Sequence, residues 1–323
     1  MSTLLRNRLP QITTAVIFIL LFAAASFRYD YFFSFRNGSS LFISNASPGI
    51  IAVGMTLVIF AGGIDLSVGA VAGFTNIFLA TQVESHGWHP LAAMVVGLVI
   101  GAGFGAAMVA VIHYFKQPAF LVTLAGMFFA RGAAFWISES SVTIKHPFFV
   151  QLTDLRATLA GSTIHPLPAI IFLLVLVAGY LVAQFTRFGR NLLAIGGSEQ
   201  SALLMGLPVG GTKIAAYAVC GGLAALGGLT NTFITGSGNC TFGTGLELDA
   251  IATVVIGGTI LTGGRGHMLG TLLGVMIVGT IQLIIAFDGT LSASWTRIIT
   301  GALLLAFILF QRLLLRATQK RLA

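Results

Sequence analysis

Long apolar stretches separated by short polar loops run through this sequence from end to end. A helix needs about 20 apolar residues to cross the hydrocarbon core of a bilayer. Only Gly62, Gly63, Ile64 and Asp65 separate the second stretch from the third, so one of these two is expected to be broken or re-entrant. Counted in this way, the pattern predicts about ten membrane-spanning helices, at residues 10–27, 42–61, 66–83, 91–112, 118–138, 168–185, 213–235, 247–262, 268–286 and 293–311.

The basic residues predict which loops face the cytoplasm, because Lys and Arg concentrate in the cytoplasmic loops of membrane proteins. With the N-terminus inside, most of the 17 Lys and Arg residues fall in inside segments. This bias predicts an even number of spans and both termini in the cytoplasm. Eight spans would satisfy the bias as well as ten, and nine would not.

Composition agrees with a membrane protein. The chain is 56% hydrophobic and 8% charged, whereas a soluble domain is usually about 25% charged. The expected fold is therefore an all-α polytopic membrane protein, with residues 1–323 forming a single transmembrane domain. The net charge of +8 is explained by membrane orientation, and no nucleic-acid partner is expected. The first apolar run ends without a small-residue cleavage site, which predicts a retained anchor helix.

The longest basic interruption, residues 186–212, is expected to be a cytoplasmic loop that holds a short helix. Ser198 is a candidate N-cap, and the carboxylate of Glu199 suits the first turn of a helix from Ser198 to Met205. Gly206 and Pro208 then end the helix. We interpret this helix as a docking site for a soluble partner; a surface loop without a partner is the alternative.

On the opposite face, the outer loop 139–167 is long enough to form a small cap over the mouth of a transport path. A simple connector is an equally reasonable interpretation.

Polar side chains within or beside the apolar runs are candidates for a substrate path. Ionisable groups are expensive in a bilayer, and amides and hydroxyls suit the recognition of sugar hydroxyls. Several alternatives remain open: Asp65 could cap a helix, Arg131 could pair with Glu139, and a single Ser, Thr or Asn often bonds to a neighbouring helix. The candidate path residues are Asn45, Asp65, Ser67, Asn76, Thr123, Arg131, Asn231, Glu247 and Asp249.

Two glycine pairs, Gly62-Gly63 and Gly263-Gly264, both fall at predicted inside ends of spans. Each pair is followed by a further glycine six residues after its second member. Helix packing explains most intramembrane glycines. The two loops are similar in sequence, but this similarity does not define a five-helix repeat.

The sequence contains no GxSxG, HExxH or GxxxxGK[ST] motif and no cluster of metal ligands. We therefore expect no enzyme, no metal site and no cofactor on this chain. If transport is active, the energy must come from another polypeptide. The alternatives are a stand-alone ion-coupled secondary carrier of a small polar solute and, from another class, an intramembrane enzyme.

Several segments carry a family resemblance. Residues 49–74 (GIIAVGMTLVIFAGGIDLSVGAVAGF), 117–132 (QPAFLVTLAGMFFARG), 186–206 (TRFGRNLLAIGGSEQSALLMG) and 247–264 (ELDAIATVVIGGTILTGG) resemble the membrane permeases of binding-protein-dependent sugar ABC importers of the ribose/xylose/arabinose type. The phrases LAGMFFARG, ELDAIATVVIGGT and FDGTLSASWTRI (287–298) are most similar to galactofuranose-importer permeases.

This resemblance implies a bacterial inner (plasma) membrane importer of a monosaccharide, galactofuranose or a ribose-like sugar, that works by alternating access. Two permeases, either sister chains or two copies, would pair with ABC ATPase subunits that bind ATP and Mg, and with a periplasmic sugar-binding protein. The segment from Arg187 to Gly206 would meet the ATPase. Its sequence Glu199-Gln200-Ser201-Ala202 departs from the EAA pattern of other ABC importers, so the contact is assigned by segment. The implied coupling residues are Arg187, Arg190, Gly196, Gly197, Ser198, Glu199, Met205 and Gly206.

Overall fold

The structure, a computed structural model, describes residues 3–159, 162–292 and 294–319. The ends of the chain that were predicted to be cytoplasmic include Lys320 and Arg321, which lie outside the described residues. The described helices are α1 (Thr3–Arg28), α2 (Phe35–Ser44), α3 (Ala46–Phe60), α4 (Val68–Glu84), α5 (Pro90–Tyr114), α6 (Ala119–Ile137), α7 (Pro147–Thr153), α8 (Leu167–Phe185), α9 (Arg187–Gly197), α10 (Glu199–Leu204), α11 (Val209–Thr235), α12 (Leu246–Ile256), α13 (Met268–Asp288) and α14 (Ser294–Gln319).

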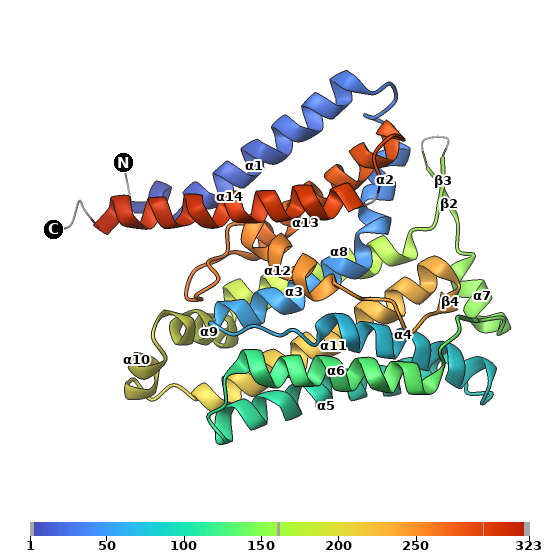
Figure 1. Cartoon of the computed structure of the whole chain (residues 1–323), viewed down its shortest axis with the longest axis horizontal. Helices are drawn as coiled ribbons and strands as arrows, with labels where there is room; N and C mark the ends of the chain where they lie inside the picture. The colour runs from blue at the N-terminus through green and yellow to red at the C-terminus, as the bar shows by residue number, and fades with distance from the viewer. Residues whose placement is uncertain (1–2, 160–161, 293, 320–323) are drawn as a thin grey trace.

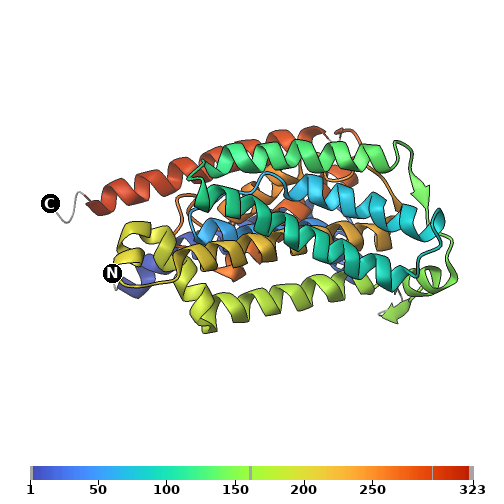
Figure 2. The same ribbon diagram turned by 90° about the horizontal axis from the view of Figure 1, so that it is seen from below.

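Most of the long helices run between two ends of the molecule. One end carries α9 and α10, together with the described beginning of α1 and the described end of α14 (Figures 1 and 2). The opposite end carries α7 and four short strands, β1 (Val142–Thr143), β2 (Ala157–Leu159), β3 (Ser162–Ile164) and β4 (Ser237–Gly238). These strands form two antiparallel pairs, β1 with β4 and β2 with β3. The predicted outer loop 139–167 therefore contains a short helix and three strands.

Six of the described helices are long and apolar enough to cross a membrane: α1 from Gln11, α5, α6, α8, α11 and α13. A seventh candidate is the pair α2 and α3, which is bent by 53°. The architecture is thus an all-α polytopic membrane protein with fewer full-length spans than the predicted ten. The expected break in the second or third stretch lies inside the second stretch, at Asn45 between α2 and α3.

Two of the predicted spans are shorter than the bilayer rule assumes. At 1.5 Å per residue, the 17 residues of α4 reach about 26 Å and the 11 residues of α12 about 17 Å. By contrast, α14 is a helix of 26 residues, and Ser294–Leu309 within it is apolar. Hydropathy alone could not show that α12 ends at Ile256, because the apolar sequence continues beyond it.

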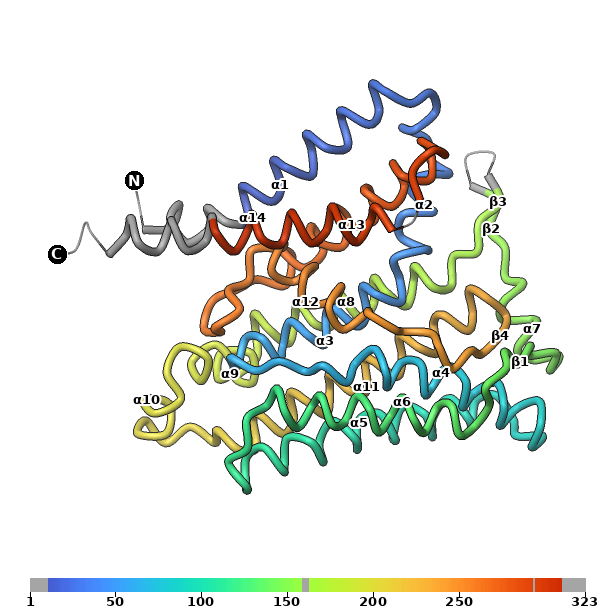
Figure 3. Tube along the Cα trace, in the orientation of Figure 1, coloured from blue at the N-terminus to red at the C-terminus, as the bar shows by residue number. Residues whose placement is uncertain are grey.

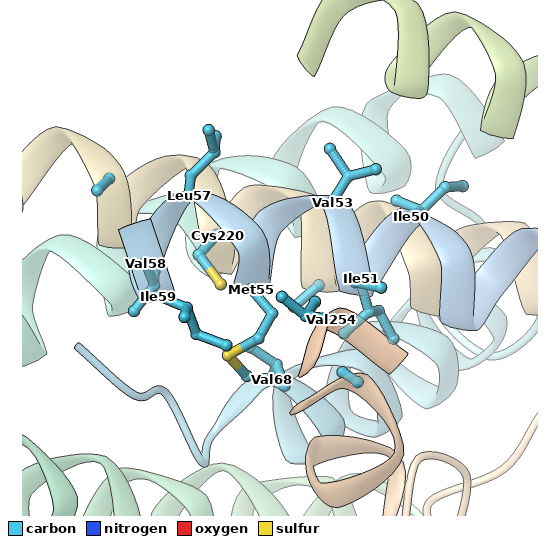
Figure 4. Packing of buried hydrophobic residues seen from close by; sticks show 14 of the residues in the cluster. Ile50, Ile51, Val53, Met55, Leu57, Val58, Ile59, Val68, Cys220 and Val254 are labelled. Carbon is cyan, nitrogen blue, oxygen red and sulfur yellow. The ribbon is translucent and has the colours of Figure 1, made fainter. Parts of the chain in front are cut away.

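The centre of the bundle is built around α11, which packs most extensively against α5, α3 and α4. Nearly every side chain of α3 is buried, as expected for a helix that is apolar on all sides. Figure 4 shows Met55 of α3, Cys220 of α11 and Val254 of α12 within this packing. Cys220 and Cys240 are both free and buried, which agrees with cysteine acting as a small apolar residue.

Candidate functional site: a capped helix at one end and a pocket within the bundle

The predicted short helix of the inside loop is present as α10. The hydroxyl of Ser198 accepts a hydrogen bond from the backbone N–H of Ser201 at 3.2 Å and caps the N-terminus of the helix. The helix ends where Gly206 adopts φ +76°, and the N–H of Leu207 donates to the carbonyl of Ala202 at 3.0 Å. This is the glycine C-terminal motif that the sequence predicts.

The tip of α10 is apolar and exposed. The exposed fractions of Leu203, Leu204 and Met205 are 56%, 84% and 69%. At the first residue of α10, a carboxylate oxygen of Glu199 lies 2.6 Å from the ammonium of Lys213 in α11. This ion pair holds α10 against the bundle. An exposed apolar group on a rigid, capped helix is typical of a protein-binding surface.

The helix before α10 carries the predicted basic residues on its outer side. Thr186 caps α9 by accepting a hydrogen bond from the N–H of Gly189 at 3.2 Å. Arg187 and Arg190 are exposed, whereas Leu192 and Ile195 are buried against the bundle. The two faces of α9 therefore link a charged surface to the transmembrane core.

The end of α9 meets both of the glycine loops that the sequence singled out. The N–H of Gly264 donates to the carbonyl of Phe60 at 3.1 Å, which joins the loop after α12 to the end of α3. A Cβ placed on Gly196 would lie 2.0 Å from that carbonyl oxygen and 2.4 Å from the N atom of Gly264. Figure 3 shows the three segments converging at this end of the molecule. We name the five glycines of these contacts the glycine junction: Gly62, Gly196, Gly197, Gly263 and Gly264.

The glycine junction lies directly before the N-cap of α10, so α10 is close in sequence to a backbone contact with the core. Ser198, the N-cap of α10, follows Gly197 immediately, and Gly196 touches the ends of α3 and of the loop after α12. A displacement of α10 would consequently be transmitted through backbone atoms, which pack without the compliance of flexible side chains.

Two path candidates, Asp65 and Ser67, shape the loop that leads into α4. The Asp65 carboxylate accepts hydrogen bonds from the N–H of Ser67 at 2.9 Å and from its hydroxyl at 2.7 Å. Tyr217 of α11 donates its hydroxyl to the carbonyl of Ile64 at 3.2 Å. Asp65 thus stabilises the turn that precedes α4, and α4 itself begins at Val68.

Asn76 and Thr123 make hydrogen bonds within the helix bundle. The amide of Asn76 donates to the carbonyl of Gly228 at 3.1 Å and to the hydroxyl of Thr232 at 2.8 Å, which ties α4 to α11. Thr123 donates to the carbonyl of Ala119 in its own helix at 2.8 Å. Asn231 is half-buried on α11. These contacts match the packing alternative for intramembrane polar residues.

Arg131 holds the outer loop that precedes α12. Its guanidinium donates to the carbonyls of Cys240 at 3.1 Å and Phe242 at 2.6 Å, while a Glu247 carboxylate oxygen accepts from the N–H of Gly245 at 3.2 Å. Among the described contacts, Arg131 bonds to this loop and not to Glu139. Arg131 and Glu247 therefore define the start of α12 from two sides.

We predict that Arg131→Leu lowers the free energy of unfolding by about 2 kcal/mol, because two carbonyls lose a charged donor in a partly buried site. Thermal unfolding of the purified protein in detergent measures the effect. Arg190→Leu, which removes an exposed arginine, is the matched control and should stay within about 0.5 kcal/mol of wild type. Equal stability of both variants would contradict this role for Arg131.

Asn45 and Asp249 line one continuous region beside α12, α13 and α14. A narrow pocket of about 40 Å³ includes Asn45, Asp249, Thr253 and Gln282. A larger pocket of about 530 Å³ shares Asp249 and Gln282 with it and also contains Arg297. Gln282 and Arg297 are not among the candidate path residues named from the sequence. Gln282 is nevertheless an amide within a long apolar run, and such a side chain suits a path for sugars.

A capped helix at one end of a bundle of apolar helices, with a pocket of charged and amide side chains farther along the bundle, is the architecture expected of a membrane transport subunit. The chain matches the family of "Branched-chain amino acid transport system / permease component" over residues 39–308, and it belongs to this family of permease components.

The relatives are ABC transporter and sugar import permeases. The chain is 46% identical to the inner membrane ABC transporter permease protein YjfF of Escherichia coli K12, with 96% of this chain and 93% of the relative covered. It is 38% identical to the fructose import permease protein FruG of Bifidobacterium longum, over 95% and 92% of the two chains. It is 35% identical to the ribose import permease protein RbsC of Escherichia coli K12, over 83% of each. No solved structure matches the chain.

These relatives confirm the resemblance to ribose-type sugar permeases and the expectation that the chain is a transport subunit and not an enzyme.

Proposed function

We propose that this chain is the permease subunit of an ATP-driven, binding-protein-dependent monosaccharide importer in a bacterial inner membrane. The observation that carries the proposal is the exposed apolar tip of α10, held by Glu199 and Lys213 and connected through the glycine junction to α3 and α12. The sugar permeases RbsC and FruG support the substrate class. The partners would be ABC ATPase subunits carrying ATP and Mg, a second permease and a periplasmic sugar-binding protein.

The proposed topology has about ten membrane passages and both termini in the cytoplasm. Support comes from the common position of the beginning of α1 and the end of α14, at the same end as α10 (Figure 1). In this topology α4, α12 and α14 supply passages in addition to the six or seven full-length spans. The short α12 would cross together with the glycine-rich loop that follows it.

The proposed coupling mechanism begins when ATP binding closes the ATPase subunits and moves α10. The movement would pass through Gly196 to the carbonyl end of α3 and to the loop after α12, which shift relative to each other as the bundle changes access. ATP must interact differently with the two states for such a bias to exist. The proposed coupling residues remain Arg187, Arg190, Gly196, Gly197, Ser198, Glu199, Met205 and Gly206.

The substrate is proposed to be a neutral monosaccharide, either galactofuranose or a ribose-like sugar. The ribose and fructose permeases among the relatives support a monosaccharide in general. Of the predicted path residues, Asn45 and Asp249 are the two whose side chains line the polar pockets.

Sugar uptake into proteoliposomes tests the proposal. The chain would be reconstituted together with its ATPase and a sister permease, and uptake would be measured with and without ATP and the binding protein. We expect uptake that requires both partners and ATP. Uptake by the chain alone on an ion gradient would overturn the proposal in favour of a secondary carrier.

We predict that Gly206→Ala weakens coupling. Gly206 has φ +76°, a conformation that costs a residue with a Cβ about 1–3 kcal/mol, so the end of α10 should fray. ATP-driven uptake should fall several-fold while the bundle keeps its thermal stability. Gly211→Ala is the matched control, because a Cβ there meets open space and the backbone is helical. Wild-type uptake by Gly206→Ala would argue against α10 as the docking element.

A further inference from the structure

The pocket of about 530 Å³ between α12, α13 and α14 has the size of a ligand site rather than a packing defect, since small-molecule pockets usually measure about 300–1,000 Å³. Its lining comes from the first turn of α12, the last three turns of α13, the loop after α13 and the first two turns of α14. The end of α13 and the start of α14 lie toward the end of the molecule opposite α10, where the predicted outer face is, and α12 begins nearer the middle (Figure 1). The pocket therefore extends from the predicted outer side toward the middle of the bundle.

Two charged groups of opposite sign face this space. Asp249 lies in the first turn of α12, and Arg297 reaches over the start of that helix from α14. A Cβ placed on Gly245 would lie 3.8 Å from a terminal nitrogen of Arg297, which locates the guanidinium beside the N-terminus of α12. The two charges balance, so the pocket has no net attraction for an anion or a cation.

Two neutral polar groups in the same pocket have hydrogen-bonding capacity left over. The hydroxyl of Thr300 is buried, with 4% of the residue exposed, and makes no hydrogen bond among the described residues. Gln282 is exposed to the pocket from α13. Buried polar groups are normally satisfied, and one that is not calls for an absent partner. In a transmembrane segment such groups mark substrate paths.

The pocket continues inwards. Asp249, Val278 and Gln282 also line the narrow pocket of about 40 Å³, whose other polar residues are Asn45 and Thr253. Asn45 lies at the 53° bend between α2 and α3. The polar lining thus leads from the start of α14 to the bend between α2 and α3. The far end of α3 reaches the glycine junction.

We propose that this pocket, formed by Asp249, Gln282, Arg297 and Thr300, is the outer binding site for the imported sugar. The inference rests on the proposed function and adds the site and the charge class of its ligand. A carboxylate accepts hydrogen bonds from sugar hydroxyls, a guanidinium donates to them, and an amide does both. With balanced charge, this set binds a neutral monosaccharide and has no preference for a sugar phosphate.

Uptake by the reconstituted importer tests the site. Gln282→Leu and Asp249→Leu each remove hydrogen bonds to the sugar, and each should reduce uptake about tenfold at low sugar concentration. Gln151→Leu, at an exposed glutamine of α7 on the same face, is the matched control and should transport normally. Co-purification of the ATPase and thermal unfolding of each variant verify that the complex is assembled. Unchanged uptake by both assembled pocket variants would overturn the inference.

A labelling experiment provides a second, independent measurement. Gln282→Cys places a thiol in the pocket, and the two native cysteines are buried. In the assembled importer, ribose, fructose or galactofuranose at saturating concentration should slow its reaction with a hydrophilic maleimide several-fold, and ribose 5-phosphate should not. Absence of protection by all three sugars, or equal protection by the phosphate, would overturn the site.

The two hypotheses fail in different ways. ATP-dependent uptake by the wild-type importer with unaffected pocket variants would reject the pocket and leave the proposed function standing. Wild-type uptake that ignores ATP and the ATPase would reject the proposed function itself.

Discussion

Replacing Leu204 with aspartate should abolish ATP-driven sugar uptake. Leu204 is 84% exposed at the tip of α10 and contributes little to the packing of the chain itself, so the variant should fold. If the tip fills an apolar pocket on the ATPase, a carboxylate there would be desolvated without a partner. Loss of a central interface anchor typically costs at least about 2 kcal/mol, or roughly 30-fold in affinity.

Co-purification measures the first consequence and proteoliposome uptake the second. The ATPase should no longer co-purify with the Leu204→Asp permease, and uptake should fall to the level without ATP. Phe115→Asp is the matched control, because Phe115 is 70% exposed in the loop between α5 and α6 at the same end of the bundle (Figure 2). An ATPase that binds Leu204→Asp normally and drives wild-type uptake would show that α10 is not the docking surface.

The sequence predicted α10 accurately because its signals are local. A serine that caps the N-terminus and a glycine that ends the helix act within one or two turns of the chain, so no distant residue had to be known. The resemblance to sugar permeases was likewise carried by continuous segments, and the relatives confirm it.

The span count was harder to predict for a physical reason. Hydropathy records how apolar a stretch is but not whether its helix continues. The second stretch bends at Asn45, and α12 stops after 11 residues although the apolar sequence runs on to Leu261. The segment after α12 is held by a contact far away in sequence, the hydrogen bond from the N–H of Gly264 to the carbonyl of Phe60. Six or seven full-length apolar spans are therefore found within the described residues, where length and polarity alone indicated ten.

The polar residues show the same limit. Sequence identifies Asn76 as an amide in an apolar run, but only the fold shows that Gly228, Thr232 and Asn239 satisfy it. Conversely, Arg297 stands beside Trp295 at the start of a predicted span, as an arginine at the membrane interface would, and the fold places it in a pocket with Asp249. Which face of a helix meets which neighbour decides between packing and a path, and that information is not local.

The glycine loops are the clearest case, and they lead to the second large effect. Gly196→Ala should destabilise the protein and disrupt coupling. The added Cβ would lie 2.0 Å from the Phe60 carbonyl oxygen and 2.4 Å from the Gly264 nitrogen, which are backbone atoms joined to each other by a hydrogen bond. Neither can move aside as a flexible side chain would, so α9 must shift away from both loops. Overpacking of this kind typically costs about 1–3 kcal/mol.

The adjacent Gly197 provides an unusually close control for this prediction. Gly197 ends the same helix, yet a Cβ placed on it meets nothing within 4 Å. Thermal unfolding should therefore show lower stability for Gly196→Ala and no loss of stability for Gly197→Ala. The number of sugars transported per ATP hydrolysed should fall at least several-fold for Gly196→Ala, because displaced loops no longer follow α10. If Gly196→Ala matched wild type in both stability and this ratio, backbone contact at the glycine junction could not be the route by which α10 controls the bundle.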